Sequence, residues 1–251
     1  MKGNQLLKSI IINFEPTSTL ILPLAKFEIL QGLFYKLLSY DKELSAQIHN
    51  TEGLCGKYFK MFCFTDIQGR YHIQNKTIAY SGDLSWEIRA MNDAAIDTIA
   101  DGLKEEKMFF IDKTQCIVTG IWEQSRAALM SGTSEVLMNT PITVYETSDD
   151  KFRKYYAPDD DRFYFAVENN LKNKYKALYG KECEERILFT RNAIAETKKC
   201  VTYYANSPIT AYYGSFFLTG PAEIFDIAYY CGLGAKNSQG FGTINKTVGG
   251  N

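Results

Sequence analysis

The sequence lacks an excess of charge of either sign, which limits the ways it could bind a nucleic acid. Its 28 Lys and Arg residues are balanced by 29 Asp and Glu residues, for a formal net charge of -1. Proteins that bind nucleic acids without regard to sequence usually carry a clear basic excess. The composition therefore argues against indiscriminate binding, and any nucleic-acid contact has to come from a local group of residues.

Signals for metals and membranes are equally scarce. The chain has two histidines and six cysteines, and no two cysteines form a CxxC pair. This pattern argues against a metal site, and it predicts free thiols in a reducing cytoplasm and no cofactor. No apolar run approaches the roughly 18 residues of a membrane span. The N-terminus also lacks the apolar core of a signal peptide, so no membrane association is expected.

What the chain does contain is enough apolar residues for a core, at 45%, and many aromatics, at 14%. Aromatic residues favour β-structure. Residue spacing in the first half predicts a βαββαβ order, which is typical of a ferredoxin-like domain. We expect a short extra helix capped by Asp41 and an extra strand at Ser85–Met91. The main elements expected are strands at Gln5–Phe14, Tyr58–Thr65, Tyr71–Tyr80 and Lys107–Gly120, a loop at Glu15–Leu24, and helices at Lys26–Ser39 and from Asn92 or Asp93 to Glu105.

The second half repeats this order with one additional strand. Helices are expected at Asp159–Tyr179 and Pro221–Tyr230. The domain boundary should fall near Ala127–Glu135, which divides the chain into residues 1–132 and 133–251. The expected fold class is therefore α+β, with two ferredoxin-like domains in tandem. The strands expected here are Val136–Glu146, Arg186–Thr190, Cys200–Tyr204, Ile209–Leu218 and Phe241–Val248.

The most distinctive segment is the glycine-rich loop, residues Gly232–Gly242, with the sequence GLGAKNSQGFG. Its glycines permit positive φ and close approach of backbones. Exposed N–H groups in such a loop can bind phosphates. Because it follows a helix and precedes a strand, it is neither a Walker loop nor a dinucleotide-binding fingerprint. The alternative is an ordinary connector in which Gly232 ends the helix.

The glycine-rich loop, of the form G-h-G-x5-G-F-G with h apolar, closely resembles the C-terminal signature of the CRISPR repeat-processing endoribonucleases, the Cas-six family of RAMP proteins. Other segments are similar to that family, in the same order along the chain. The resemblance implies tandem ferredoxin-like domains and cleavage of CRISPR repeat RNA without a metal. The similar segments are Leu30–Tyr35, Ile48–His49, Lys60–Thr65, Thr140–Ile142 and Asn170–Tyr175.

The resemblance also implies roles for individual residues. Cleavage by the RNA's own 2′-hydroxyl needs proton transfer and positive charge near the phosphate, and leaves a 2′,3′-cyclic phosphate and a 5′-hydroxyl. His49 is the proton-transfer candidate because imidazole titrates near neutrality. Tyr35 would position groups or transfer a second proton, and Lys60 would stabilise the phosphate, with Lys57 as the alternative lysine. The residues expected to bind RNA are Lys57, Gly232, Gly234, Lys236, Asn237, Ser238, Gly240 and Gly242.

Each of these residues also has a structural interpretation. His49 could be a surface histidine at a helix end, Tyr35 a half-buried core aromatic, and Lys60 a cation at a strand edge. For the whole chain, the alternatives to a nuclease are a non-catalytic RAMP subunit that holds guide RNA, or a general RNA-binding module. The expected partner is CRISPR repeat RNA. Other subunits of a CRISPR effector complex and a second copy of the chain remain open.

Overall fold

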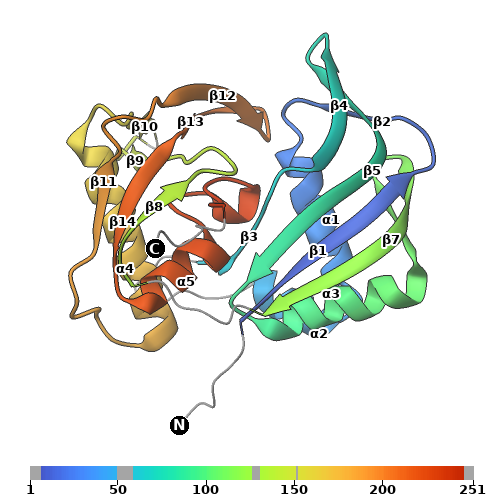
Figure 1. The fold of residues 1–251 in the computed structure, drawn as a ribbon, viewed down its shortest axis with the longest axis horizontal. Helices are drawn as coiled ribbons and strands as arrows, with labels where there is room; N and C mark the ends of the chain where they lie inside the picture. Colours follow the sequence, from blue (N-terminus) through green and yellow to red (C-terminus); the bar gives the residue numbers. More distant parts are fainter. Residues whose placement is uncertain (1–6, 50–58, 126–130, 151, 246–251) are drawn as a thin grey trace.

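The computed structural model describes residues 7–49, 59–125, 131–150 and 152–245. Two halves lie side by side, each built on an antiparallel sheet (Figure 1). The first half contains β1 (Lys8–Pro16), β2 (Leu20–Pro23), α1 (Phe27–Leu38), α2 (Lys42–His49), β3 (Phe62–Phe64), β4 (Gln68–Gln74), β5 (Thr77–Ala90), α3 (Asp93–Glu106), β6 (Met108–Ile111) and β7 (Thr114–Ser125).

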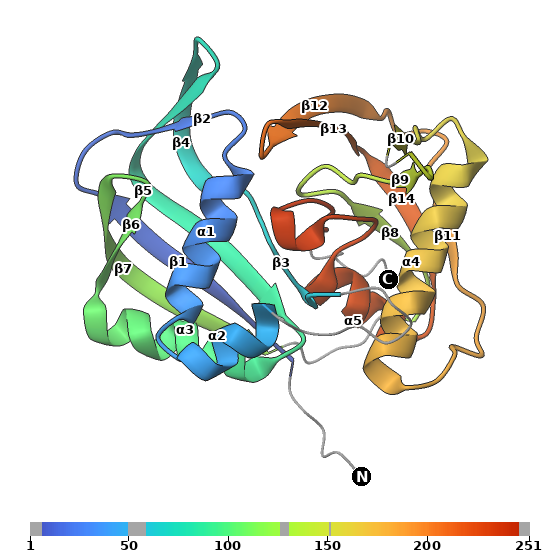
Figure 2. The ribbon, with the colours of Figure 1, turned by 180° about the vertical axis from the view of Figure 1, so that it is seen from behind.

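The first sheet has the strand order β2-β5-β1-β7-β6, and β3 and β4 both pair with β5. The helices α1 and α3 connect its central strands, which gives the predicted βαββαβ order. Figure 2 shows α1, α2 and α3 together on one face of this sheet. In both views β3 lies on the side of the sheet nearest the second half.

Helical spacing explains how α1 packs on the sheet. The predicted apolar stripe is buried, and Phe34 and Leu38 are fully so. Burial of each such side chain stabilises the folded state by roughly 1.5–3 kcal/mol. The helix α3 begins as predicted, since the side chain of Asn92 accepts a hydrogen bond from the Ala94 N–H. The Asp41 carboxylate caps α2 in the same way by accepting from the Leu44 N–H, at 2.9 Å.

The second half has a smaller sheet of order β11-β14-β8, and Ile244 forms an isolated antiparallel bridge with Met138, the residue after β8. This arrangement matches the strand order of the first half, as the expected pair of ferredoxin-like domains requires. The elements are β8 (Gly132–Leu137), β9 (Tyr145–Thr147), β10 (Arg153–Tyr155), α4 (Asp161–Tyr179), β11 (Leu188–Arg191), β12 (Lys198–Tyr204), β13 (Ser207–Tyr213), β14 (Ser215–Gly220), α5 (Ala222–Cys231) and a 3-10 turn, η2 (Asn237–Gln239).

Several expected element bounds were wrong because turn signals were misplaced. The strand expected at Tyr71–Tyr80 is instead a hairpin that turns at Asn75 and Lys76, with φ of 49° and 64°. Two consecutive positive φ values are typical of the turn that joins β-hairpin strands. The strand expected at Ser85–Met91 is instead the second part of the long β5. The loop expected at Glu15–Leu24 contains β2, an edge strand that ends at Pro23, where proline is tolerated.

Three further strands were also predicted as too long. The strand expected at Lys107–Gly120 is a hairpin of β6 and β7, with Asp112 at a φ of 52° in its turn. The strand expected at Ile209–Leu218 is divided between β13 and β14 at Gly214, where φ is 159°. The expected Val136–Glu146 likewise covers parts of β8 and β9, and residues between these two strands form isolated bridges with Ile244, Tyr212 and Ala235.

The two halves share buried residues. Phe241, from the glycine-rich loop, packs in the core of the first half, with its ring centroid 5.2 Å from that of Phe27. The buried guanidinium of Arg89 on β5 donates to the Ile244 carbonyl at 2.6 Å. The β12–β13 hairpin extends over the junction, as Figure 1 shows, and the Ala205 N–H donates to the Glu28 carboxylate on α1 at 3.0 Å. These contacts fix the halves against each other.

The boundary expected near Ala127–Glu135 lies partly outside the described residues, and the division at 132/133 stays a prediction. The end of the last expected strand, up to Val248, also lies outside them. None of the helices in the described ranges combines the length and apolar character that a membrane-spanning helix needs.

Candidate active site

Two of the three expected catalytic side chains meet at the junction of α1 and β3. The ammonium of Lys60 donates a hydrogen bond of 2.7 Å to the Tyr35 hydroxyl, and it lies 5.0 Å from the centroid of the Tyr35 ring. Phe62 braces this arrangement, since its ring stacks on Phe34 at 3.9 Å and meets Tyr35 edge-on at 5.9 Å. The aromatic packing of α1 on β3 therefore positions both polar groups.

Partial burial changes the acidity of both groups. Burial raises the pKa of Tyr35 to about 12, and burial also lowers the pKa of Lys60 from its ordinary value. A phenol with such a pKa keeps its proton at neutral pH and is a poor base. Tyr35 is therefore suited to orient the ammonium and to donate its own proton in a hydrogen bond, and Lys60 to meet a phosphate.

His49 is the last residue of α2. Leu44 and Ile48 on this helix are buried, as their spacing predicts. The side chain of His49 and the whole of Lys57 lie outside the described residues. Whether the imidazole joins the Tyr35–Lys60 pair stays a prediction, as does the role of Lys57.

The glycine-rich loop follows α5, and Gly232 ends that helix with a φ of 72°. Its glycines are needed for close packing. A Cβ on Gly242 would lie 2.0 Å from the Leu233 carbonyl oxygen, and one on Gly234 would lie 2.7 Å from the Thr143 carbonyl oxygen. A Cβ on Gly240 would lie 2.8 Å from the Phe27 ring. These contacts explain the spacing of the glycines without any ligand.

The expectation that the loop's N–H groups face phosphates is wrong for much of the loop. The Gly242 N–H donates to the Pro141 carbonyl at 3.1 Å, and the Gly240 N–H to the Asn237 carbonyl at 3.0 Å. The glycines at 232, 234, 240 and 242 are all buried. The loop is held by protein contacts, and its side chains are left to meet a ligand.

Asn237 is buried and holds the loop, and its expected contact with RNA stays a prediction. Its amide nitrogen donates to the carbonyls of Leu233 and Phe241 at 2.8 and 2.9 Å. Its amide oxygen accepts from the buried ammonium of Lys174 on α4, at 2.7 Å. Lys174 also donates to the Gly232 carbonyl at 2.7 Å, and burial lowers its pKa to about 8. A direct RNA contact by Asn237 would require breaking this network.

The loop is tied to α1, one turn before Tyr35. The side-chain amide of Gln31 donates to the Ser238 carbonyl at 2.6 Å and accepts from the hydroxyl of Tyr204 on the β12–β13 hairpin. Residues four apart on a helix lie on the same face, so Gln31 and Tyr35 both face this side. The half-buried Ser238 is therefore close in space to the Tyr35–Lys60 pair.

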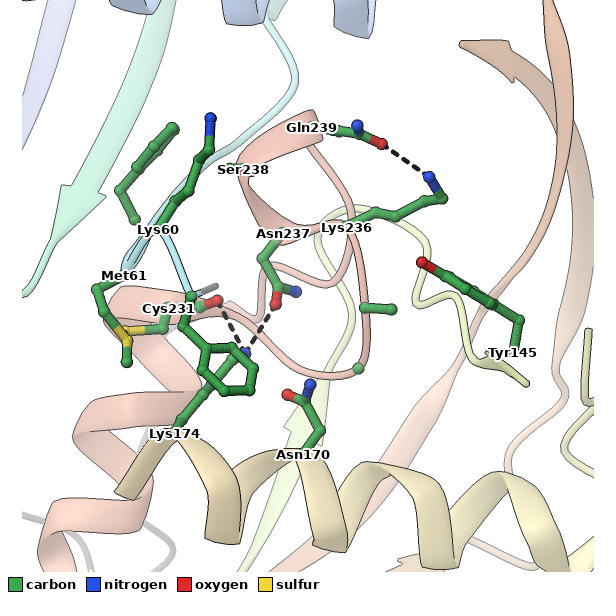
Figure 3. A pocket seen from close by; sticks show the side chains of 14 residues that line it. Lys60, Met61, Tyr145, Asn170, Lys174, Cys231, Lys236, Asn237, Ser238 and Gln239 are labelled. Carbon is green, nitrogen blue, oxygen red and sulfur yellow. Dashed lines mark hydrogen bonds between the residues drawn. The ribbon is translucent and has the colours of Figure 1, made fainter. Parts of the chain in front are cut away.

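A cavity of about 390 Å³ lies between this pair and the loop (Figure 3). Lys60, Lys236 and Ser238 are among its lining residues. Lys236 donates to the Gln239 side chain at 3.1 Å, and burial, aided by the charge of Arg153, lowers its pKa to about 8. Lys60 and Lys236 line this cavity together with the buried Lys174, and these lysines give the local positive charge that the neutral composition lacks.

Lys174, Gln31 and Tyr145 shape the site and were not predicted individually. The sequence did contain a signal for Lys174, because this residue lies in the segment Asn170–Tyr175 that resembles the family. Gln31 stands in the similar segment Leu30–Tyr35. Tyr145 carries no sequence signal. Within the described ranges, no cluster of His, Cys, Asp or Glu is arranged to hold a metal ion.

Two ferredoxin-like domains with a glycine-rich loop packed between them are the architecture that the resemblance found in the sequence implies. Residues 126–246 match the family "CRISPR associated protein Cas6, C-terminal". Residues 126–246 are thus similar to the C-terminal domain of that family, and the resemblance found in the sequence is confirmed.

Individual proteins show the same similarity. The chain is 23% identical over 232 residues to the CRISPR-associated endoribonuclease Cas6 1 of Methanocaldococcus jannaschii, covering 87% of this chain and 84% of that protein. It has the fold of a Cas6-related protein from Pyrococcus furiosus, with a TM-score of 0.80, 18% identity and coverage of 95% and 98%. A structure described as an RAMP protein binding different RNA substrates gives a TM-score of 0.77 at 21% identity, with 95% and 98% covered.

Proposed function

We propose that this protein cuts CRISPR repeat RNA in precursor transcripts, without a metal, to release guide RNAs. The observation that carries the proposal is the Lys60–Tyr35 hydrogen bond beside a cavity that also holds Lys236. Its relative from Methanocaldococcus jannaschii is named as an endoribonuclease, which supports RNA cleavage as the reaction.

In this proposal the RNA supplies the nucleophile. The 2′-hydroxyl attacks the adjacent phosphorus, the bond to the 5′-oxygen breaks, and a 2′,3′-cyclic phosphate and a 5′-hydroxyl remain. His49 transfers a proton in this step, Lys60 stabilises the additional negative charge on the phosphate, and Tyr35 holds Lys60 in place. Lys57 is a further phosphate contact, and Lys236 and Ser238 bind the RNA backbone.

Incubation of the purified protein with the repeat RNA of its own genome, in EDTA, tests the reaction. Cleavage should persist, and the ends should carry a cyclic phosphate and a hydroxyl. An absolute need for a divalent cation would overturn the mechanism. Removal of a general acid or base costs about 10²- to 10⁴-fold in rate, so we expect a loss of that order in His49→Ala, with RNA affinity nearly unchanged.

His72 is the matched control, because it is the other histidine and lies exposed on β4. His72→Ala should cleave at the normal rate. If the wild-type protein binds the repeat tightly but does not cut it in single-turnover experiments, the chain is a guide-RNA-binding subunit. Association with effector-complex subunits or a second copy, and a cytoplasmic location, remain predictions.

A further inference from the structure

A second cavity, of about 800 Å³, lies along α4 beside the first one. Tyr145 and Asn170 line both cavities, together with Gly234 and Ala235 of the glycine-rich loop. In Figure 3, Asn170 points from α4 toward the loop, between Lys174 and Tyr145. A strand of RNA with its phosphate at Lys60 could therefore continue from one cavity into the other.

We propose that the cavity along α4 binds one unpaired nucleobase of the RNA, from a nucleotide close to the scissile phosphate. The base stacks on Phe165 and donates a hydrogen bond to Asn170. This inference rests on the proposed function and adds to it a site that recognises the sequence beside the cut.

Phe165 is exposed without a packing role that explains it. The side chain is 62% exposed, although Phe163, Val167 and Leu171 on the same helix are fully buried. An aromatic ring left in water at the wall of a cavity offers a face on which a base can stack. Stacking of this kind accepts any base, so Phe165 alone would add affinity and no sequence preference.

The side-chain amides of α4 give the cavity a preference for particular bases. The side-chain oxygen of Asn170 is buried, and among the described residues it accepts no hydrogen bond. A buried acceptor without a donor costs about 1–3 kcal/mol, and an N–H on the edge of a base would satisfy it. Asn169 and Asn173 line the same cavity with further donors and acceptors. Bases with an exocyclic amino group present the required N–H.

The charges around the cavity fit a nucleotide. Lys236 and Arg153 both lie over the ring of Tyr145, with the charged groups 5.6 and 5.5 Å from its centroid. Among the described residues that line the cavity, Glu146 is the one carboxylate, and it accepts a hydrogen bond from the Tyr156 hydroxyl. Lys236 and Arg153 are thus placed to bind the phosphate of the nucleotide, and the Glu146 carboxylate is already hydrogen-bonded to Tyr156.

The test combines variants of the protein with single changes in the RNA. A repeat RNA with a 2′-deoxy nucleotide at the mapped cut cannot be cleaved, so its dissociation constant can be measured directly. Phe165→Ala should bind this RNA about 10-fold more weakly, the usual effect of losing one base stack. Phe152→Ala is the matched control, because Phe152 is 73% exposed but lies outside the cavity, and its affinity should not change.

The RNA is then changed to an abasic nucleotide at each position near the cut. At one position, loss of the base should weaken binding to the wild-type protein about 10-fold. The same RNA should bind the Phe165→Ala variant no more weakly than the unmodified RNA does. At that position, replacing the amino group of the base by hydrogen should weaken wild-type binding about fivefold and leave Asn170→Ala unaffected. If the loss of binding free energy from Phe165→Ala adds to the loss from the abasic nucleotide at every position, the inference is wrong even when cleavage is intact. A protein that neither binds nor cuts the repeat would instead overturn the proposed function.

Discussion

The ammonium of Lys60 and the hydroxyl of Tyr35 are joined by a hydrogen bond of 2.7 Å across 25 positions of the chain. Tyr35 reaches this place because α1 packs on β3 through Phe34 and Phe62. Burial raises the pKa of the phenol to about 12. The proton therefore stays on Tyr35 at neutral pH, which favours a positioning role for Tyr35 over a role as a base.

Tyr35→Phe removes the acceptor for Lys60 and keeps the aromatic packing. We expect cleavage to slow by roughly 10- to 100-fold, because a misplaced electrostatic group stabilises the transition state less well. RNA affinity should change by less than about threefold, since the charge of Lys60 remains. Single-turnover rates and dissociation constants, measured on the same RNA, separate the two effects.

Tyr40→Phe serves as the control for this change. Tyr40 follows α1 and is 44% exposed, so the loss of its hydroxyl should leave the rate unaltered. The same Tyr35→Phe variant also distinguishes positioning from proton transfer. A rate that falls as much as in His49→Ala would make Tyr35 a proton-transfer group and contradict a purely positioning role.

Asn237 should matter for folding more than for direct RNA contact. Asn237→Ala removes three hydrogen bonds of the loop, to Leu233, Phe241 and Lys174. Each buried bond is worth about 1 kcal/mol, and unpaired partners add to the cost. We therefore expect the free energy of unfolding to fall by about 2–4 kcal/mol, as measured by urea denaturation.

Ser238→Ala is the natural comparison for that measurement. Ser238 is half-buried, and it is its backbone carbonyl, not its side chain, that accepts from Gln31. The free energy of unfolding of the Ser238→Ala variant should change by less than about 0.5 kcal/mol. Any effect of this substitution should appear in the affinity for RNA. Equal stabilities for the two variants would show that the network around Asn237 does not hold the loop.

The sequence predicted the order of elements better than their ends. The ends of the main helices were correct to within two residues, and the cap expected at Asn92 is formed before α3. Strand ends depend on which turn residues take positive φ, and Asn75-Lys76 was not recognised as such a turn. The same limit applied to Asp112 between β6 and β7. Local sequence does not settle which of several polar pairs will form the turn.

For the site, the sequence placed the right residue types but not all their roles. Tyr35 and Lys60 do lie together. The glycine-rich loop was correctly expected to need positive φ, whereas its buried amides and the inward-facing Asn237 could not be foreseen. These follow from contacts with Pro141, Thr143 and Lys174, which are about 60 to 100 residues distant in the chain. Spacing along the sequence carries no information about such partners.

The close packing of the loop gives a prediction for its glycines. Gly242 has a φ of 78°, and an added Cβ would lie 2.0 Å from the Leu233 carbonyl oxygen. Gly242→Ala should therefore destabilise the protein by more than about 3 kcal/mol or prevent folding. Gly32→Ala is the control, because Gly32 is exposed on α1 with open space around its Cβ position, and it should raise stability by about 0.5–1 kcal/mol. Thermal unfolding of both variants measures this, and a normal melting temperature for Gly242→Ala would contradict the packing.

Lys236 should make RNA binding depend on pH in a range where most lysines do not titrate. Burial lowers its pKa to about 8 in the free protein. A bound phosphate favours the charged ammonium and raises that pKa again, so binding takes up a proton above pH 8. Affinity should therefore be full below pH 7 and fall as the pH rises, by roughly 10-fold between pH 7 and pH 9 if the bound pKa exceeds 10. Measurements at constant ionic strength are needed because salt alone changes such affinities.

The Lys236→Arg variant isolates this effect from the nearby Lys60, whose pKa is also lowered by burial. A guanidinium stays protonated throughout the range, so the variant should lose most of the dependence on pH while keeping its affinity at pH 7. Lys236→Gln should likewise be independent of pH in this range, but with weaker binding at pH 7. If all three proteins lose affinity in parallel between pH 7 and pH 9, another group is responsible, and Lys236 does not contact the phosphate.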